Sequence, residues 1–221
     1  MYCILVTGIP ASGKSTMARF LAEACGLPVI SKDRIKECMY DTIGFRSREE
    51  KVKLGIASMQ IMYDLAEELM RSARPFILEN NFENVSKEGL LTILKKYKYK
   101  AITVTLTGDY KIIYQRFLER NRDPGRHPGH VVNDCYPGSK EINSPVQISY
   151  ESFVEGITQR GMDSFTANGP QIILDTTDFG RLDREDLVRR IQDIVQDVLS
   201  ICSTLSETLK LGAVLCRRRP Y

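Results

Sequence analysis

Long hydrophobic runs are absent from this sequence of 221 residues. No stretch reaches about 18 consecutive apolar residues, the length that a transmembrane helix needs, so the sequence offers no candidate membrane span. The short apolar segment before Thr7 follows no basic region and leads to no cleavage-type sequence, which argues against a secretory signal. These absences predict a cytoplasmic protein that does not span a membrane.

Metal-site and disulfide patterns are missing as well. The sequence has 2 histidines and no CxxC pair, which is too little for a zinc site. Six cysteines are scattered along the chain: Cys3, Cys25, Cys38, Cys135, Cys202 and Cys216. Because their spacing suggests no pairing, we expect all of them to be free thiols.

A strong excess of charge of either sign is also lacking. The 31 lysines and arginines face 28 aspartates and glutamates, and the net charge of +3 is too small to indicate nucleic acid by itself. With 43% hydrophobic and 27% charged residues, the composition is that of an ordinary globular protein. The length is typical of one domain.

Short β-prone runs alternate with amphipathic segments along the chain. Strands are predicted at residues 2–7, 28–30, 75–78, 101–106 and 171–174. Helices are predicted between the glycine-rich loop and Gly26, at 47–73, at 86–97, from 109 to about 120, around 146–160 and at 183–199. This alternation predicts an α/β fold with a parallel sheet that helices cover on both faces.

Four residues are predicted to mark helix ends. Ser86, Asp109 and Asp183 precede periodic segments and are expected to start helices, whereas Gly26 is expected to end one. The segment 47–73 has an apolar face formed by Val52, Met59, Met62, Leu65, Ala66 and Leu69. We expect this face to be buried.

The segment 8–15 reads GIPASGKS and matches the pattern G-x-x-x-x-G-K-[ST] between a predicted strand and a predicted helix. Glycines let the backbone N–H groups turn inward, and the lysine reaches the β and γ phosphates of a nucleotide. The serine hydroxyl of such a loop binds Mg²⁺. The predicted nucleotide contacts are Gly8, Pro10, Ala11, Ser12, Gly13, Lys14, Ser15 and Thr16, with Ser15 also on the metal. The alternative, an incidental glycine turn, does not explain the flanking strand and helix.

The other motifs of a GTPase are missing. Residues 41–44 read DTIG and match D-x-x-G by letters, but they follow the helical stretch 35–40 and no strand. No guanine-specifying Asn/Thr-Lys-x-Asp motif occurs in a suitable context. A compact phosphotransferase is the remaining interpretation of the loop.

Four segments together resemble the P-loop kinases that include zeta toxins, polynucleotide 5′-hydroxyl kinases, seryl-tRNA kinases and antibiotic phosphotransferases. They read GIPASGKST at 8–16, ISKD at 30–33, FILENN at 76–81 and RHPGH at 126–130. The resemblance covers about residues 2–200 and implies a three-layer sandwich with a five-stranded parallel sheet in the order 2-3-1-4-5. It also implies a kinase domain at 1–205 with a lid at about 120–140, followed by a C-terminal tail at 206–221.

The same resemblance implies roles for two carboxylates. Asp33, after the second strand, would face the acceptor hydroxyl as a catalytic residue, although it can alternatively cap the helix that follows. Glu79 stands where the family usually has the aspartate that holds Mg²⁺ through water, and its longer side chain leaves direct metal contact open. Asn80 and Asn81 either line the acceptor pocket or form a turn. Lys36 occupies a region where relatives that act on nucleic-acid ends tend to have arginine.

The lid is expected to be basic and mobile. Lys14 and the lid arginines Arg120 and Arg126 would compensate charge on the transferred phosphoryl group as catalytic residues, and Arg116 would bind the nucleotide. Arg122, His127 and His130 are the other charged or titratable lid residues. The loop 175–178 resembles the adenine-side loop of the family. The alternative for each arginine is a solvated basic surface.

These assignments predict an ATP-dependent kinase that uses Mg²⁺ and phosphorylates a hydroxyl of a small molecule. A polynucleotide or tRNA kinase is an alternative, because the lid and the segment 217–219 are basic. No aromatic-rich basic platform for stacking bases favours it. A nucleotide-binding regulatory or toxin-like protein is a third alternative. The sequence names neither the acceptor nor the oligomeric state.

Overall fold

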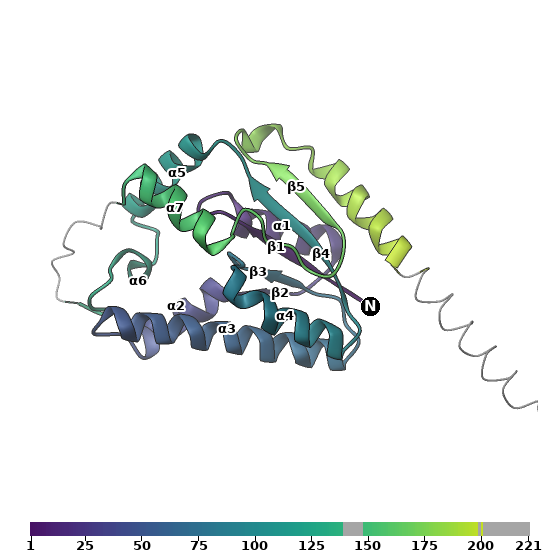
Figure 1. The fold of residues 1–221 in the computed structure, drawn as a ribbon, viewed down its shortest axis with the longest axis horizontal. Coiled ribbons are helices and arrows are strands. Elements are labelled where there is room, and N and C mark those ends of the chain that lie inside the picture. Colours follow the sequence, from purple (N-terminus) through teal and green to yellow (C-terminus); the bar gives the residue numbers. More distant parts are fainter. Residues whose placement is uncertain (139–147, 199, 201–221) are drawn as a thin grey trace, which may run out of the picture.

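A five-stranded parallel sheet forms the centre of the molecule, and its strand order is β2-β3-β1-β4-β5 (Figure 1). The computed structural model describes residues 1–138, 148–198 and 200. The strands are β1 (Tyr2–Gly8), β2 (Val29–Ser31), β3 (Ile77–Glu79), β4 (Lys100–Thr107) and β5 (Gln171–Asp175). The predicted fold class and strand order are therefore confirmed.

Helices connect the strands and lie on both faces of the sheet. They are α1 (Lys14–Cys25), α2 (Lys32–Thr42), α3 (Arg48–Arg71), α4 (Asn84–Lys96), α5 (Tyr110–Arg122), α6 (Pro128–Val131), α7 (Tyr150–Arg160), the short 3-10 helix η1 (Phe179–Arg181) and a helix at 184–198. None of the described helices is long and apolar enough to cross a membrane. The predicted tail at 206–221 lies outside the described residues, as do Cys202 and Cys216.

An apolar cluster on each face of the sheet joins the sheet to the helices that cover it, and this arrangement gives three layers. On one face, Met62 and Ala66 of α3 and Leu90 of α4 pack against Leu5 and Leu78 of the sheet. On the other face, Met17 and Leu21 of α1 and Leu187 and Ile191 of the helix 184–198 pack against β1, β4 and β5. Residues of β1 such as Ile4 and Val6 are fully buried because neighbouring strands flank β1 on both sides, as its uninterrupted apolar run predicts.

The ends of several helices differ from the prediction in their details. Ser86 does not begin α4; it is the third residue of a capping box whose N-cap is Glu83. Asp109 is the N-cap of α5, as predicted, and its carboxylate accepts from two backbone N–H groups. Asp183 accepts from the N–H of Asp186, and Gly26 ends α1 in the left-handed conformation, so these two predictions are confirmed.

The predicted apolar face of α3 is only partly buried. Met62 and Ala66 are buried, but Val52 and Leu65 remain 44% and 46% exposed. Leu65 directly precedes Ala66, which places it about 100° around the helix from the side that faces the sheet. Tyr63 and Met70 take part in the buried face instead.

The register of the sheet brings the predicted site residues to one edge. Ser31 of β2 pairs with Glu79 of β3, and Glu79 in turn pairs with Val6 of β1. The carboxyl ends of these parallel strands therefore lie side by side, directly below the glycine-rich loop. Ligands of open α/β sheets bind at this edge.

Candidate active site

The loop between β1 and α1 has the backbone geometry of a phosphate-binding turn. Gly8 has a φ of 134°, and a Cβ atom there would lie 2.0 Å from the carbonyl oxygen of Leu106 on β4. Gly13 has a φ of 91°, and Ala11 also takes the left-handed conformation, with a φ of 63°. Glycine is therefore required at residue 8 by close packing and is favoured at residue 13 by the backbone angle.

Lys14 is the first residue of α1, and its side chain is buried. Its Nζ donates a hydrogen bond to the carbonyl oxygen of Ile9 at 2.7 Å. Burial lowers the pKa of Lys14 to about 8, although the carboxylates of Glu79 and Asp33 oppose this shift. The N–H groups of the first helical turn have no acceptor inside the helix. A buried ammonium beside free N–H groups makes this loop an anion-binding site.

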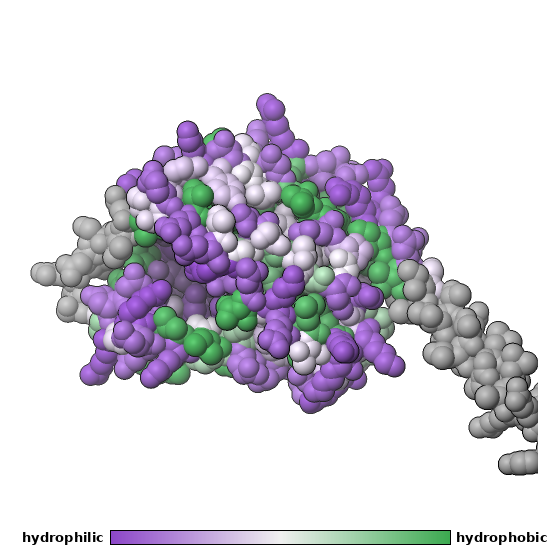
Figure 2. Space-filling view, viewed as in Figure 1, coloured by the Kyte–Doolittle hydropathy of each residue, from purple (hydrophilic) through white to green (hydrophobic). Residues whose placement is uncertain are grey.

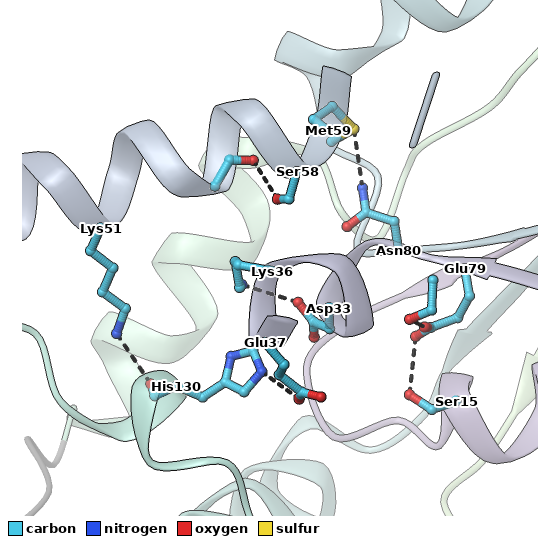
Figure 3. A network of polar contacts seen from close by, with 12 residues as sticks. Ser15, Asp33, Lys36, Glu37, Lys51, Ser58, Met59, Glu79, Asn80 and His130 are labelled. Atoms are coloured by element: carbon cyan, nitrogen blue, oxygen red, sulfur yellow. Dashed lines mark hydrogen bonds and ion pairs between the residues drawn. The ribbon is translucent and has the colours of Figure 1, made fainter. Parts of the chain in front are cut away.

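Glu79 joins three elements at the edge of the sheet. The Ser15 hydroxyl at the start of α1 donates to Glu79 Oε1 at 3.1 Å (Figure 3). The Ser31 hydroxyl at the end of β2 donates to Glu79 Oε2. Glu79 is nearly fully buried. The sequence prediction gave no role to Ser31 itself, although it is part of the ISKD segment.

The oxygen atoms of Ser15 and Glu79 are suitable for Mg²⁺, which prefers oxygen ligands and keeps several from phosphates and water. Among the described residues, no group of three or more His, Cys, Asp or Glu side chains is arranged to hold a metal ion. The protein thus offers one or two oxygen ligands at this place, which fits a metal ion that arrives with a nucleotide.

Asp33 lies in the first turn of α2, two residues beyond the end of β2. Ser31 is the N-cap of α2, so the alternative that Asp33 caps this helix is wrong. The Asp33 carboxylate forms an ion pair with Lys36 Nζ at 3.0 Å. Burial opposes the ionisation of Asp33, but the positive charges of Lys36 and Lys14 hold its pKa below the usual range. Asp33 is therefore an ionised carboxylate at neutral pH.

Arg116 of α5 is directed at the loop that follows β5. Its two terminal nitrogens donate to the carbonyl oxygens of Thr176 and Thr177 at 2.5 Å and 2.6 Å. In the same region, the ring of Phe179 lies against Gly13. Arg116, for which we predicted a nucleotide contact, therefore holds the predicted adenine-side loop in place beside the phosphate loop.

Two arginines of the predicted lid face the phosphate loop from the other side. Arg120 and Arg126 both line the cavity described below, whereas Arg122 is exposed and does not line it. Burial, followed by repulsion from Arg120, lowers the pKa of Arg126 to about 10, and Asp33 and Glu37 oppose the shift. The Nε atom of Arg126 is buried without a hydrogen-bond partner.

The lid is attached to α2 by histidine–carboxylate contacts. His130 Nε2 lies 2.8 Å from Glu37, and His127 Nε2 lies 3.0 Å from Asp41 (Figure 3 shows the first pair). The Tyr136 hydroxyl also donates to Asp41, at 2.7 Å. Asp41, which matches the first letter of D-x-x-G, thus holds the lid. Residues 139 and 140 of the predicted lid lie outside the described residues.

Lys51 of α3 makes a second attachment of the lid, which the sequence prediction missed. Its buried Nζ donates to the carbonyl oxygens of His130 and Val132 and, at 3.1 Å, to Asn133 Oδ1. Burial and nearby cations lower the pKa of Lys51 to about 8. Nothing in the local sequence distinguishes Lys51 from a solvated lysine on a helix.

These elements enclose one cavity of about 330 Å³. Its walls are formed by Pro10, Ala11, Gly13, Lys14, Ser15, Thr16, Asp33, Glu79, Asn81, Arg116, Phe117, Arg120 and Arg126. Gly8 and Ser12, which were also predicted to contact the nucleotide, are buried and do not line it. Figure 2 shows a hydrophilic hollow between the side of α5 and α7 and the side of α2 and α3.

Most of the predicted site residues therefore meet in one cavity. Asn81 faces the cavity, whereas the amide of Asn80 is directed at the sulfur of Met59. Phe117 also lines the cavity and was not among the predicted site residues. A sequence pattern cannot tell a ring in the core from one at the rim.

The strand order and the phosphate loop define a fold of the P-loop kinase type. Residues 3–135 match the family model AAA_33, described as an AAA domain, and the chain belongs to this family. A protein of Chloroflexus aurantiacus, provisionally described as a kinase, is 26% identical, with a TM-score of 0.72 over 87% of this chain and 97% of that one. Among curated proteins, none matches the sequence.

Two other solved structures share the fold. A shikimate kinase from Acinetobacter baumannii in complex with shikimate is 14% identical, with a TM-score of 0.54 over 89% of this chain and 94% of that one. A sugar kinase from Janibacter sp. HTCC2649 is 13% identical, with a TM-score of 0.52 over 89% and 95%. The resemblance to P-loop kinases is thus confirmed, but the closer resemblance to zeta toxins and polynucleotide kinases stays a prediction.

Proposed function

We propose that this chain is an ATP-dependent kinase that transfers the γ-phosphoryl group to a hydroxyl of a small molecule. The observation that carries the proposal is the placement of Lys14, Asp33 and the Ser15–Glu79 pair on the walls of one cavity. One wall offers positive charge and N–H groups for a polyphosphate. Asp33, which lines the same cavity, offers an ionised carboxylate for the acceptor.

In this proposal the phosphate loop binds the triphosphate and Lys14 neutralises charge on it. Ser15 and Glu79 would hold Mg²⁺, which when bound would neutralise negative charge on the triphosphate. The loop at 175–178, which Arg116 holds, would contact the base. Arg120 and Arg126 add positive charge at the transferred group, which stabilises the transition state more than the ground state.

Asp33 orients the acceptor. The acceptor oxygen forms a bond to the γ-phosphorus while the bond from that phosphorus to the bridging oxygen breaks, so ADP leaves. The hydroxyl proton passes to the Asp33 carboxylate. A carboxylate held ionised by Lys36 is a weak base but a firm hydrogen-bond acceptor, which suits a loose transition state in which positioning matters most.

The lid supplies the exclusion of water. Arg120 and Arg126 line the same cavity as the phosphate loop, and the lid would displace water that could otherwise take the phosphoryl group. Lys51 of α3 and Glu37 of α2 bond to the lid, and the Glu37 contact couples it to the helix that carries Asp33. This coupling supports transfer to an acceptor over hydrolysis.

The proposal is tested by measuring ADP release with candidate acceptors, namely hydroxylated metabolites, aminoglycosides, nucleosides and RNA 5′ ends. The expected result is stimulation by a small hydroxylated compound, which Lys14→Ala abolishes. Steady hydrolysis that no acceptor stimulates would support a regulatory or toxin-like protein instead. Competition by short single-stranded RNA with a steep salt dependence would support a polynucleotide kinase.

A further inference from the structure

Ser31 joins a strand to a helix, but its side chain bonds to neither of them. It is the last residue of β2 and the N-cap of α2. A serine at an N-cap usually accepts a hydrogen bond from a backbone N–H of the first helical turn. The Ser31 hydroxyl forms no such bond, and it donates instead to Oε2 of Glu79 on the neighbouring strand β3. The hydroxyl therefore supports the carboxylate and not the helix.

Two other serines show what an N-cap side chain does elsewhere in this chain. Ser47 before α3 and Ser149 before α7 each accept a hydrogen bond from a backbone N–H of their own helix. Ser31 differs because the parallel register places it directly beside Glu79, where β2 and β3 end. Side chains of residues paired in this way lie on the same face of the sheet. The register thus offers the Ser31 hydroxyl a carboxylate acceptor in place of the helix cap.

Both carboxylate oxygens of Glu79 are engaged by serine hydroxyls. Glu79 is 4% exposed, and buried polar groups need hydrogen-bond partners. Oε1 accepts from Ser15 at 3.1 Å, and Oε2 accepts from Ser31. A glutamate side chain has several rotatable bonds, so one contact leaves its carboxylate free to rotate, whereas contacts on two different oxygens fix its orientation. Ser31 holds the oxygen that Ser15 does not.

We propose that Ser31 is a positioning residue of the metal site, which holds the Glu79 carboxylate in the orientation that presents Oε1 to Ser15 and to Mg²⁺. This inference rests on the proposed function, because there the metal ion arrives with the nucleotide. Ser31 does not line the cavity, so it acts through Glu79 and not on a ligand directly. Residues that orient a metal ligand change metal affinity about 10- to 100-fold when they are replaced.

Nucleotide binding without turnover measures this role. The dissociation constant of a non-hydrolysable ATP analogue is determined by calorimetry, once with excess Mg²⁺ and once with EDTA. The ratio of the two constants is the gain in affinity that the metal ion provides. Because the Ser31 hydroxyl supports only the metal site, Ser31→Val should lower this gain about tenfold and leave the affinity in EDTA unchanged.

Ser31→Thr is the matched partner of Ser31→Val, since threonine and valine have nearly the same shape and only threonine keeps a hydroxyl. Ser31→Thr should keep the gain. Ser149→Ala removes a side chain that does cap its helix, so it should lower the melting temperature and keep the gain. Equal gains in Ser31→Thr and Ser31→Val would overturn the proposal, and so would an equal weakening of analogue binding with Mg²⁺ and with EDTA. If Ser31→Val does not fold, Ser31→Ala takes its place in this comparison.

A double-mutant cycle shows whether the effect passes through Glu79. In a Glu79→Ala background, Ser31→Thr and Ser31→Val should show the same gain, because the hydroxyl then has no carboxylate to hold. A difference that persists in this background would contradict the positioning role. Acceptor-stimulated ADP release is measured separately. If no acceptor stimulates it while the gain depends on the Ser31 hydroxyl as predicted, the proposed function fails and the positioning of Glu79 by Ser31 stands.

Discussion

The hydroxyl of Ser15 donates a hydrogen bond to Glu79 Oε1 at 3.1 Å and thereby joins the phosphate loop to the end of β3. The side chain of Glu79 thus reaches Ser15, the residue of the phosphate loop whose hydroxyl is predicted to bind a metal ion. The extra methylene relative to aspartate is accommodated because the carboxylate is also held from the side of β2, by Ser31. Glutamate at residue 79, where the family usually has aspartate, is therefore compatible with a metal site.

Glu79→Gln should weaken the use of Mg²⁺, because the amide offers a weaker, uncharged ligand beside Ser15. We expect the Mg²⁺ concentration for half-maximal activity to rise about 10- to 100-fold, as for other residues that support a metal site. Titration of activity with Mg²⁺ at saturating ATP measures it. Glu88→Gln, at an exposed place on α4, should leave the titration unchanged, and an unchanged titration in Glu79→Gln would remove Glu79 from the metal site.

Lys14→Ala should keep the fold and lose most turnover. The buried ammonium contributes charge where charge develops in the transition state, so kcat should fall about 10²- to 10³-fold. Its pKa is lowered by burial, which means that the folded state does not depend on this charge. Circular dichroism and steady-state kinetics are the measurements, with Lys111→Ala on the exposed side of α5 as the control. Activity close to that of the unchanged protein would contradict the phosphate-loop assignment.

The affinity for ATP should depend on the protonation of Lys14. Burial lowers the pKa of Lys14 to about 8, so the protonated fraction in the free protein falls as the pH rises through 8. Phosphate favours the charged form, and binding above this pH must therefore take up a proton. We expect the KM for ATP to rise about tenfold per pH unit above pH 8.

Two variants test whether this pH dependence comes from Lys14 or from Lys51, whose pKa is also about 8. Lys14→Arg should flatten the alkaline rise in KM, because arginine stays charged. Lys51→Met should keep it. If the KM for ATP still rises above pH 8 in Lys14→Arg, a group other than Lys14 is responsible for the titration.

Lys51 should stabilise the attachment of the lid. Lys51→Met leaves the carbonyl oxygens of His130 and Val132 without their donor, at a cost of about 1–3 kcal/mol for a buried acceptor. We expect faster proteolysis within 120–138 and a raised KM for the acceptor. A saturating ATP analogue together with an acceptor should protect this segment. Lys53→Met, at an exposed residue of α3, is the control. If neither the ligands nor Lys51→Met changes the rate of cleavage, the proposed role of the lid is contradicted.

The phosphate loop could be predicted because its signal is local, whereas the order of the strands came from the resemblance to P-loop kinases. A glycine-rich turn between a buried strand and an amphipathic helix occupies few consecutive residues. Its glycines are explained by the backbone conformation and its lysine by the charge of the phosphates. Asp33 could be placed for the same reason, since it follows β2 directly. The start of α4 could not, because serine is a common N-cap and glutamate is not, whereas here Glu83 is the N-cap and Ser86 is the N3 residue.

The attachment of the lid could not be predicted. Glu37 and His130 are 93 residues apart, and Lys51 bonds to backbone oxygens that carry no sequence signal. Arg116 shows the same limit, because nucleotide contact was predicted for it, whereas its terminal nitrogens bond to the loop after β5. Which arginine meets a ligand and which meets the protein depends on packing between distant segments.

The most direct test of the account is acceptor-dependent ADP release by Asp33→Asn, measured together with ATP affinity. The amide keeps the shape of the carboxylate but cannot take the hydroxyl proton near neutral pH. We predict a loss of acceptor turnover of about 10²- to 10⁴-fold, the usual value of general base catalysis, with ATP affinity retained. Turnover near that of the unchanged protein would contradict the placement of the acceptor at Asp33 and with it the proposed reaction.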